Sequence, residues 1–303
     1  MPDFTALGFE SNDVNGSRTG NKGGILYSTS SALPYPERES GLVPYYDNTA
    51  CQTTGDWNCS AAKARNGGLP QLANITAHVE ALSLDIARQI PDQNSTGVYS
   101  FDWEFWWPVW EQNSDGDVHG NPPQTSIYVN KSIALVQAKH PSWTLAQTIA
   151  QAKDEFEAAA KIYFLETLRT AKQLRPLARW GFYNFPNCDG PGDGAPGVAP
   201  CSCSGSRNDA LEWLYDEVTS LQPSIYVYYD HPENTTKNAF YAECQMAESK
   251  RVVASAAARG TRVAGELPIY TFVWPRYHMN HYDGKLTFVT TFLQTCAKPK
   301  IYA

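Results

Sequence analysis

The sequence predicts an α/β protein with the architecture of a TIM-type (β/α) barrel. Short apolar runs that predict strands lie at residues 24–28, 97–104, 179–183, 224–229 and 267–273. They show no regular alternation of apolar and polar residues, which favours strands buried on both faces in a parallel sheet. Helical patterns separate most of these runs, and a chain of 303 residues is long enough for a barrel rather than a small open sheet.

Four helices are expected between these strands, at residues 69–90, 142–173, 207–221 and 238–259. In the first, apolar residues recur at helical spacing, at Ile75, Val79, Leu82 and Ile86. The second is dense in Ala, Glu, Lys and Gln and ends before Pro176. Residues 33–68 are rich in Pro and Gly and predict a long loop.

Charge and composition restrict the partners of the chain. The formal net charge of −7, together with the lack of a basic stripe or a nucleic-acid-binding motif, argues against a nucleic-acid partner. No apolar stretch approaches the length of a membrane span. Aromatic residues make up 13% of the chain, which fits either a sugar-binding cleft or a large core.

The cysteines and glycosylation motifs favour an oxidising compartment, so we expect a secreted or lysosomal protein. Seven cysteines are present, and the odd number leaves one thiol without a partner in this chain. Cys51 and Cys59 are close enough in sequence to form a disulfide. The six Asn-x-Ser/Thr motifs are at Asn15, Asn58, Asn74, Asn94, Asn130 and Asn234. The amino terminus shows no signal-peptide pattern.

Asp102 and Glu104 are the candidate catalytic residues, because they form an acid pair at the end of a predicted strand. On an extended backbone their Cβ atoms would lie on one face, roughly 7 Å apart. Two close carboxylates raise the pKa of one of them, and aromatic neighbours desolvate it further. A carboxyl that keeps its proton can protonate a glycosidic oxygen. From spacing alone, a salt bridge or a helix cap is the more common role of such a pair, and the aromatic neighbours and the strand-end position make acid catalysis an equal alternative.

Several ordered sequence blocks resemble the hyaluronidase family of glycoside hydrolases. The matching blocks span residues 67–71, 101–104 with Trp106 and Pro108, 128–132, 140–143, 174–176, 180–188, 208–213, 223–226 and 267–269. The resemblance covers about residues 24–277 and implies the distorted β/α barrel of that family. It also implies endo-hydrolysis of β-linked N-acetylhexosaminide bonds in hyaluronan or chondroitin.

The resemblance assigns roles to individual residues. Glu104 matches the proton donor, and Asp102 matches the partner that orients the substrate's acetamido group, whose own oxygen acts as the nucleophile. Tyr183 and Tyr226 match residues around the N-acetyl subsite. More distant substrate contacts are expected from Tyr35, Tyr277, Trp103 and Trp107, and packing is the alternative for Tyr35 and Tyr277.

Two departures from the family pattern favour an alternative function. Trp107 stands where the family usually has an arginine, so that a charge and its hydrogen-bond donors are lost, although an indole can still stack on a sugar. The chain also begins after the family's first barrel strand and diverges after Tyr277, so the first and last strands are expected to be missing from this single domain of residues 1–303. The alternative is an inactive carbohydrate-binding or vestigial relative.

The remaining expectations concern disulfides, metals and partners. By resemblance, Cys188 pairs with either Cys201 or Cys203, closing a loop of about 14 residues worth roughly 3 kcal/mol. No dinucleotide fingerprint, P-loop or zinc-ligand spacing occurs, so no cofactor and no metal is expected. The expected partner is a glycosaminoglycan substrate, with no nucleic acid and no membrane span, and the protein is expected to be a monomer.

Overall fold

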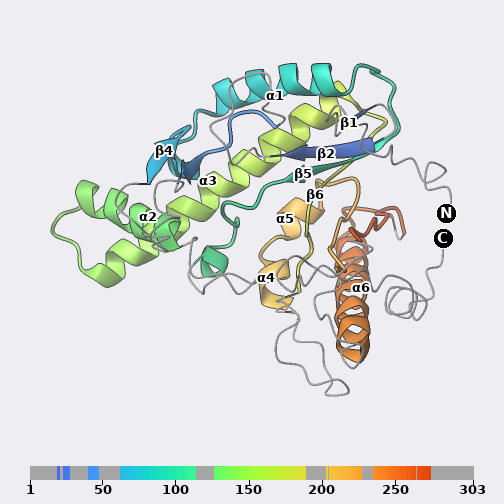
Figure 1. Cartoon of the computed structure of the whole chain (residues 1–303). Coiled ribbons are helices and arrows are strands. Elements are labelled where there is room, and N and C mark those ends of the chain that lie inside the picture. The colour runs from blue at the N-terminus through green and yellow to red at the C-terminus, as the bar shows by residue number, and fades with distance from the viewer. Residues whose placement is uncertain are drawn as a thin grey trace. The chain divides into compact units, whose positions relative to one another are not determined.

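The computed structural model describes residues 19–20, 23–27, 40–47, 62–113, 126–188, 203, 205–226, 235–263 and 265–273. The chain divides into two compact units, residues 1–180 and 181–303, coloured from blue to yellow and from yellow to red in Figure 1. No helix in the described part of the chain is both long and apolar enough to cross a membrane.

The sheet of the first unit has the strand order β1-β2-β5-β6. Its strands are β1 (Thr19–Gly20), β2 (Gly23–Tyr27), β5 (Val98–Asp102) and β6 (Arg179–Phe182), and the last continues into the second unit. β2 and β5 are parallel and in register from Gly23 opposite Val98 to Tyr27 opposite Asp102, whereas β1 is antiparallel to β2. The parallel pairing predicted for the strands at residues 24–28 and 97–104 is thus confirmed.

Two helices of the first unit, α1 (Ile75–Gln89) and α3 (Leu145–Leu174), lie side by side near the sheet (Figure 1). The predicted helix at residues 69–90 is interrupted: a 3₁₀ turn η3 (Pro70–Leu72) comes first, and Asn74 then caps α1 by accepting a hydrogen bond from the backbone of Ala77. α3 begins with a reciprocal capping box between Thr144 and Gln147, which satisfies two backbone donors of its first turn.

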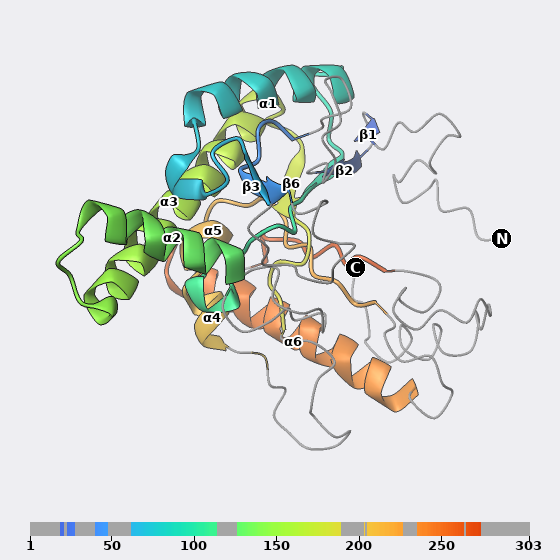
Figure 2. The ribbon, with the colours of Figure 1, turned by 60° about the vertical axis from the view of Figure 1, so that its left-hand side comes forward.

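Four further elements of the first unit were not predicted. α2 (Ser126–Lys139) packs beside the first half of α3, as Figure 2 shows in green, and η4 (Trp110–Asn113) follows the acid pair. The expected loop at residues 33–68 contains an antiparallel pair, β3 (Tyr45–Asp47) and β4 (Lys63–Arg65). Gly67 closes this region with a φ of +95°, and a Cβ there would lie 2.4 Å from the carbonyl oxygen of Leu72. Only glycine fits this position.

The second unit contains paired extended segments and the helices α4 (Gly205–Asp209), α5 (Glu212–Tyr215) and α6 (Thr235–Ala258). Leu221 and Ser224 form parallel bridges with Ile269 and Phe272, so the extended segments predicted near residues 224 and 267 pair in parallel. The prediction of one helix over residues 207–221 is wrong. The chain forms two short helices there, because the backbone of Leu211 departs from helical geometry with φ −104° and ψ 14°, and residues 216–220 are not helical.

Candidate active site

Asp102 is the last residue of β5, directly opposite Tyr27 at the end of β2. The acid pair therefore lies at the carboxyl end of parallel strands, where barrel enzymes place their catalytic side chains. Asp102 is half-buried, whereas Glu104, two residues beyond the strand, is exposed. Glu104 is thus the carboxyl group that a large solvent-borne substrate can reach.

Two buried tryptophans hold the backbone on either side of Glu104. The ring centroid of Trp103 lies 5.2 Å from those of both Tyr163 and Phe164 on α3, and its indole N–H donates to Ser40 Oγ at 3.1 Å. The ring of Trp106 packs on the same helix, and its indole N–H donates to the carbonyl oxygen of Pro44 at 2.8 Å. Because both rings are fixed at their apolar and their polar ends, the short segment that carries Glu104 has little freedom to move.

The acceptors of these indole groups belong to residues 40–47, which we call the strap. The strap is bonded to both helices behind it. His78 Nδ1 on α1 accepts the N–H of Leu42 at 3.0 Å, and the hydroxyl of Tyr163 lies 2.8 Å from the carbonyl oxygen of Leu42. Tyr45 of the strap stacks on Phe105, with ring centroids 4.3 Å apart and planes 12° apart. The strap therefore couples the acid segment to α1 and α3.

His78 is fully buried, and both of its ring nitrogens have partners. Nδ1 accepts the N–H of Leu42 and also lies 2.7 Å from the hydroxyl oxygen of Tyr163. Nε2 lies 2.9 Å from Thr167 Oγ1, whose own proton goes to the carbonyl oxygen of Tyr163. The ring therefore joins the strap to α3, and its role is structural.

Trp103 and Trp107 were expected to contact substrate, but the structure places both in the interior of the first unit. They are 5% and 8% exposed, which leaves no ring face on which a sugar can stack. Trp107 begins a turn that the buried Asn113 closes, because its side chain bonds both the N–H and the carbonyl oxygen of Trp107. Asn113 is a functional support that the sequence alone did not reveal.

Tyr183 and Tyr226 come together within the second unit. Their ring centroids are 6.1 Å apart, and Phe272 meets Tyr183 edge-on at 4.9 Å. Tyr183 follows β6 directly and is buried, whereas Tyr226 follows the bridge at Ser224 and is half-buried. Both rings therefore lie just beyond extended segments, as the sequence predicts for residues at strand ends.

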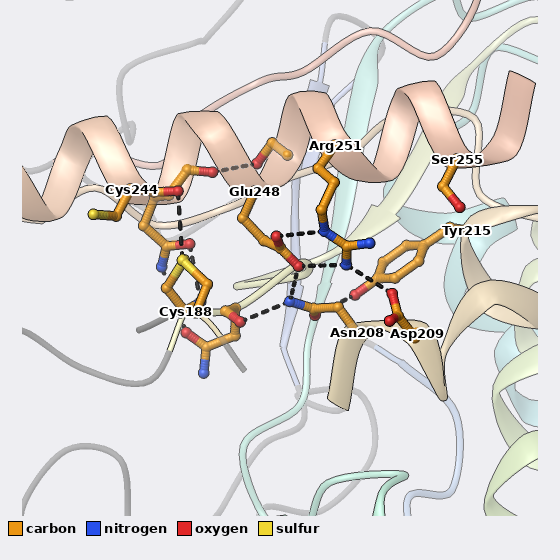
Figure 3. A network of polar contacts seen from close by, with 12 residues as sticks. Cys188, Asn208, Asp209, Tyr215, Cys244, Glu248, Arg251 and Ser255 are labelled. Carbon is orange, nitrogen blue, oxygen red and sulfur yellow. Dashed lines mark hydrogen bonds and ion pairs between the residues drawn. A yellow bond between two sulfur atoms is a disulfide. The ribbon is translucent and has the colours of Figure 1, made fainter. Parts of the chain in front are cut away.

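A buried polar network supports the loop after Tyr183 (Figure 3). The amide group of Asn208 makes three hydrogen bonds: Nδ2 donates to the carbonyl oxygen of Asn187 at 3.0 Å and to Glu248 at 2.7 Å, and Oδ1 accepts from Tyr215 at 2.8 Å. Arg251 pairs with Glu248 through two bonds of 2.8 Å each and so neutralises this buried carboxylate. Burial raises the pKa of Tyr215 well above its usual value, so its hydroxyl stays a donor.

A disulfide joins Cys188 to Cys203, which decides between the two partners that the sequence left open. Cys244 is disulfide-bonded too, to a partner outside the described residues. Of the predicted glycosylation sites, Asn74, Asn94 and Asn130 are all exposed. The other predicted site residues, Tyr35, Tyr277, Cys51, Cys59, Cys201, Asn15, Asn58 and Asn234, lie outside the described residues.

An exposed carboxyl group at the end of a parallel strand, beside a second carboxyl, is an arrangement that glycoside hydrolases use for acid catalysis. Comparison with known proteins gives the family. The family model described as hyaluronidase matches residues 45–292, and the chain belongs to this family of glycoside hydrolases.

Similar proteins agree with this assignment. A chondroitin hydrolase of Caenorhabditis elegans is 36% identical over 217 residues, which are 71% of this chain and 43% of the relative. Hyaluronidase-1 of Bos taurus is 34% identical over 249 residues, which are 80% of this chain and 48% of the relative. The chain thus spans less than half the length of these two curated relatives.

A solved structure of bee venom hyaluronidase in complex with a hyaluronic acid tetramer is similar in fold. It superposes with a TM-score of 0.74 at 23% sequence identity, over 97% of this chain and 80% of the bee protein. This similarity confirms the predicted fold class, an α/β fold like that of the barrel hyaluronidases. The single barrel domain over residues 1–303 and the missing first and last strands stay predictions.

Proposed function

We propose that this chain hydrolyses β-linked N-acetylhexosaminide bonds inside hyaluronan or chondroitin, with Glu104 as the proton donor. The observation that carries the proposal is the placement of Glu104: it is exposed, lies two residues beyond the half-buried Asp102, and is flanked by the buried Trp103 and Trp106. A proton donor must keep one position through the reaction, and this anchoring provides it.

In the proposed reaction the substrate supplies the nucleophile. The acetamido carbonyl oxygen attacks the anomeric carbon while Glu104 gives its proton to the departing glycosidic oxygen. Glu104 then takes a proton from the water that opens the cyclic intermediate, so the configuration at the anomeric carbon is retained. Asp102 accepts the acetamido N–H, which orients the attacking oxygen and stabilises the positive charge that develops on the ring of the intermediate.

Tyr183 and Tyr226 are proposed to contact the N-acetyl group of the reacting sugar. The pair is supported by its ring contact of 6.1 Å and by Phe272, which limits the positions open to Tyr183. Tyr35 and Tyr277 stay proposed as more distant substrate contacts. Trp103 and Trp107 are not part of this proposal, because neither has an accessible ring face.

Measuring new reducing ends tests the proposed hydrolysis. Purified protein is incubated with hyaluronan and with chondroitin between about pH 3.5 and 7. We expect Glu104→Gln to lower turnover by about 10²–10⁴-fold, because the amide cannot act as the general acid or as the general base of the reaction. Glu80→Gln, on the exposed side of α1, is the matched control and should keep wild-type turnover. Equal release by wild type and Glu104→Gln would refute the proposal.

One observation favours a second function, sugar binding without turnover. At position 107 the chain has a buried indole, which lacks the positive charge and the several N–H donors of an arginine side chain. If this function holds, hyaluronan oligosaccharides bind saturably to the wild type, Tyr226→Ala weakens the binding, and no reducing ends appear. Turnover that depends on Glu104 rules this alternative out.

The cysteines and the glycosylation motifs bear on where the protein is located. The disulfide between Cys188 and Cys203 supports folding in an oxidising compartment, and exposed Asn74, Asn94 and Asn130 are accessible to glycans. We therefore propose a secreted or lysosomal protein. Mass spectrometry of glycopeptides from protein made in a secreting cell would test each of these sites.

A further inference from the structure

One side chain of α6 contacts both segments that carry the tyrosine pair. Gln245 is fully buried on this helix, one turn before Glu248. Figure 3 shows this part of α6 beside Cys188, which lies in the loop that follows Tyr183. An uncharged amide in such a position is retained at a desolvation cost unless its donors and acceptor are used.

Gln245 bonds to the loop after Tyr183 through its carbonyl oxygen. Oε1 accepts the backbone N–H of Cys188 at 3.1 Å, and Nε2 lies 3.5 Å from Asn187 Oδ1. The same loop is bonded by Asn208 at the carbonyl oxygen of Asn187, so its end is held from two helices. The loop has few other positions available to it.

Gln245 reaches the segment of Tyr226 through a second side chain. Nε2 donates to the hydroxyl of Tyr241 at 2.8 Å, and that hydroxyl in turn donates to the carbonyl oxygen of Ser224 at 3.3 Å. Ser224 lies two residues before Tyr226. Because the Tyr241 hydroxyl gives its only proton to Ser224, it needs a donor as its other partner. A glutamine amide supplies a donor here and an acceptor at Cys188.

We infer that Gln245 is a positioning residue that sets the relative placement of Tyr183 and Tyr226. This inference rests on the proposed function, in which the two rings bind the N-acetyl group. Gln245 touches no substrate. It acts by fixing the loop after one ring and the strand before the other, so its loss widens the range of separations that the pair adopts. A misplaced pair then lowers kcat/KM.

Two substitutions distinguish the hydrogen bond to Cys188 from the hydrogen bond to Tyr241. Gln245→Met keeps the length of the side chain and removes both hydrogen bonds at every pH. Gln245→Glu keeps the acceptor for Cys188, but when ionised it has no proton for Tyr241. A buried carboxyl takes up a proton at higher pH than an exposed one, and once protonated it again offers one donor and one acceptor. Gln173→Glu, on the exposed surface of α3, is the matched control.

The first measurement is kcat/KM for hyaluronan across the acid and neutral range, as a ratio to wild type. We expect Gln245→Met to lose roughly 10-fold or more at all pH values. Gln245→Glu should lose as much near neutrality and recover as the pH falls, and the control should not change. Equal, pH-independent losses in both variants, or wild-type values in both, overturn the inference.

The second measurement tests whether Gln245 acts through the tyrosines. Combining Gln245→Met with Tyr226→Ala should lower kcat/KM by less than the product of the two single losses, since one of the two rings to be positioned is gone. Additive losses indicate a general effect on folding and overturn the inference.

The third measurement does not depend on catalysis. Backbone amide hydrogen exchange should become faster in both residues 184–188 and residues 221–226 of Gln245→Met, with α1 unchanged as an internal reference. If wild type shows no turnover, the proposed function has failed, and this exchange alone judges Gln245. Faster exchange in only one of the two segments overturns the inference.

Discussion

The acid segment of the first unit and the tyrosine pair of the second are held in place by different kinds of contact. Glu104 lies between Trp103 and Trp106, whose rings pack on α3 and whose indole groups make one hydrogen bond each. The tyrosine pair depends on a chain of amides, a carboxylate and a guanidinium, centred on Asn208 and Glu248. One support is mainly apolar and the other mainly polar.

The two kinds of contact should respond differently to substitution. Apolar packing has no required direction, so the cost of losing a ring follows the volume removed. A buried polar network is directional, and losing one member leaves the others without a partner in a place that water does not reach. Variants of the acid segment should therefore lose stability in proportion to the side-chain volume that is removed. Variants of the polar network should lose stability in proportion to the number of buried polar groups left without a hydrogen-bond partner.

The largest effect is expected from Trp103→Ala. The ring is 5% exposed and contacts two aromatic rings of α3, so its loss leaves a cavity and should lower the free energy of unfolding by about 3–5 kcal/mol. Urea unfolding measures it. Trp103→Phe should recover more than half of the loss, and failure of phenylalanine to recover any would show that the hydrogen bond to Ser40 dominates instead.

A smaller effect is expected from Glu248→Ala, about 2–3 kcal/mol. Removing this carboxylate leaves the buried Asn208 without one acceptor, whereas Arg251 is partly exposed and can be hydrated. The measurement is again urea unfolding, compared with Glu248→Gln, which keeps an acceptor for Asn208 and should lose less. Equal losses in the two variants would contradict the polar account of the second unit.

The smallest effect is expected from an exposed ion pair outside both supports. Lys139 and Glu155 join α2 to α3 at 2.9 Å, and the hydrogen bond from Lys139 holds the pKa of Glu155 below its ordinary value of 4.5. The pair therefore adds stability above that ordinary pKa, and this contribution is lost as the pH falls through the lowered pKa of the folded state. Lys139→Met should cost about 0.5 kcal/mol near neutrality and nothing in strong acid. A loss that persists in strong acid would assign it to packing.

Local patterns predicted much of the fold. The strand at residues 24–28, the helix near 142–173 and the helix near 238–259 are observed within a few residues of their predicted bounds, because their apolar periodicity agrees with the tertiary packing. The helix predicted at 207–221 is broken by a turn at residues 210–211, whereas Asn208 itself lies in α4 and contacts α6 from there. The strands β3 and β4 were missed, since three-residue strands carry no periodic signal.

The candidate site could be predicted only in part, for a similar reason. Asp102 and Glu104 were predicted because two close carboxyl groups at a strand end suit acid catalysis, and Tyr183 and Tyr226 were predicted from the resemblance to the hyaluronidase family. Gln245 and Asn208 were not, since each acquires its role from partners such as Cys188 and Glu248, which are 57 and 40 positions away along the chain. Trp103 was predicted to contact a sugar because it lies next to the acid pair in the sequence, but the structure places it in the core.

The residue that caps α1, Asn74, is also a predicted glycosylation site. Asn74 caps the helix with Oδ1, whereas an N-linked glycan is attached to the side-chain nitrogen, so the same residue can carry a sugar and still cap. Enzymatic removal of that glycan by amide hydrolysis leaves an aspartate. The new negative charge would face the positive end of the helix dipole, a favourable place for it. Deglycosylated protein would then have a more stable first turn than the unmodified chain.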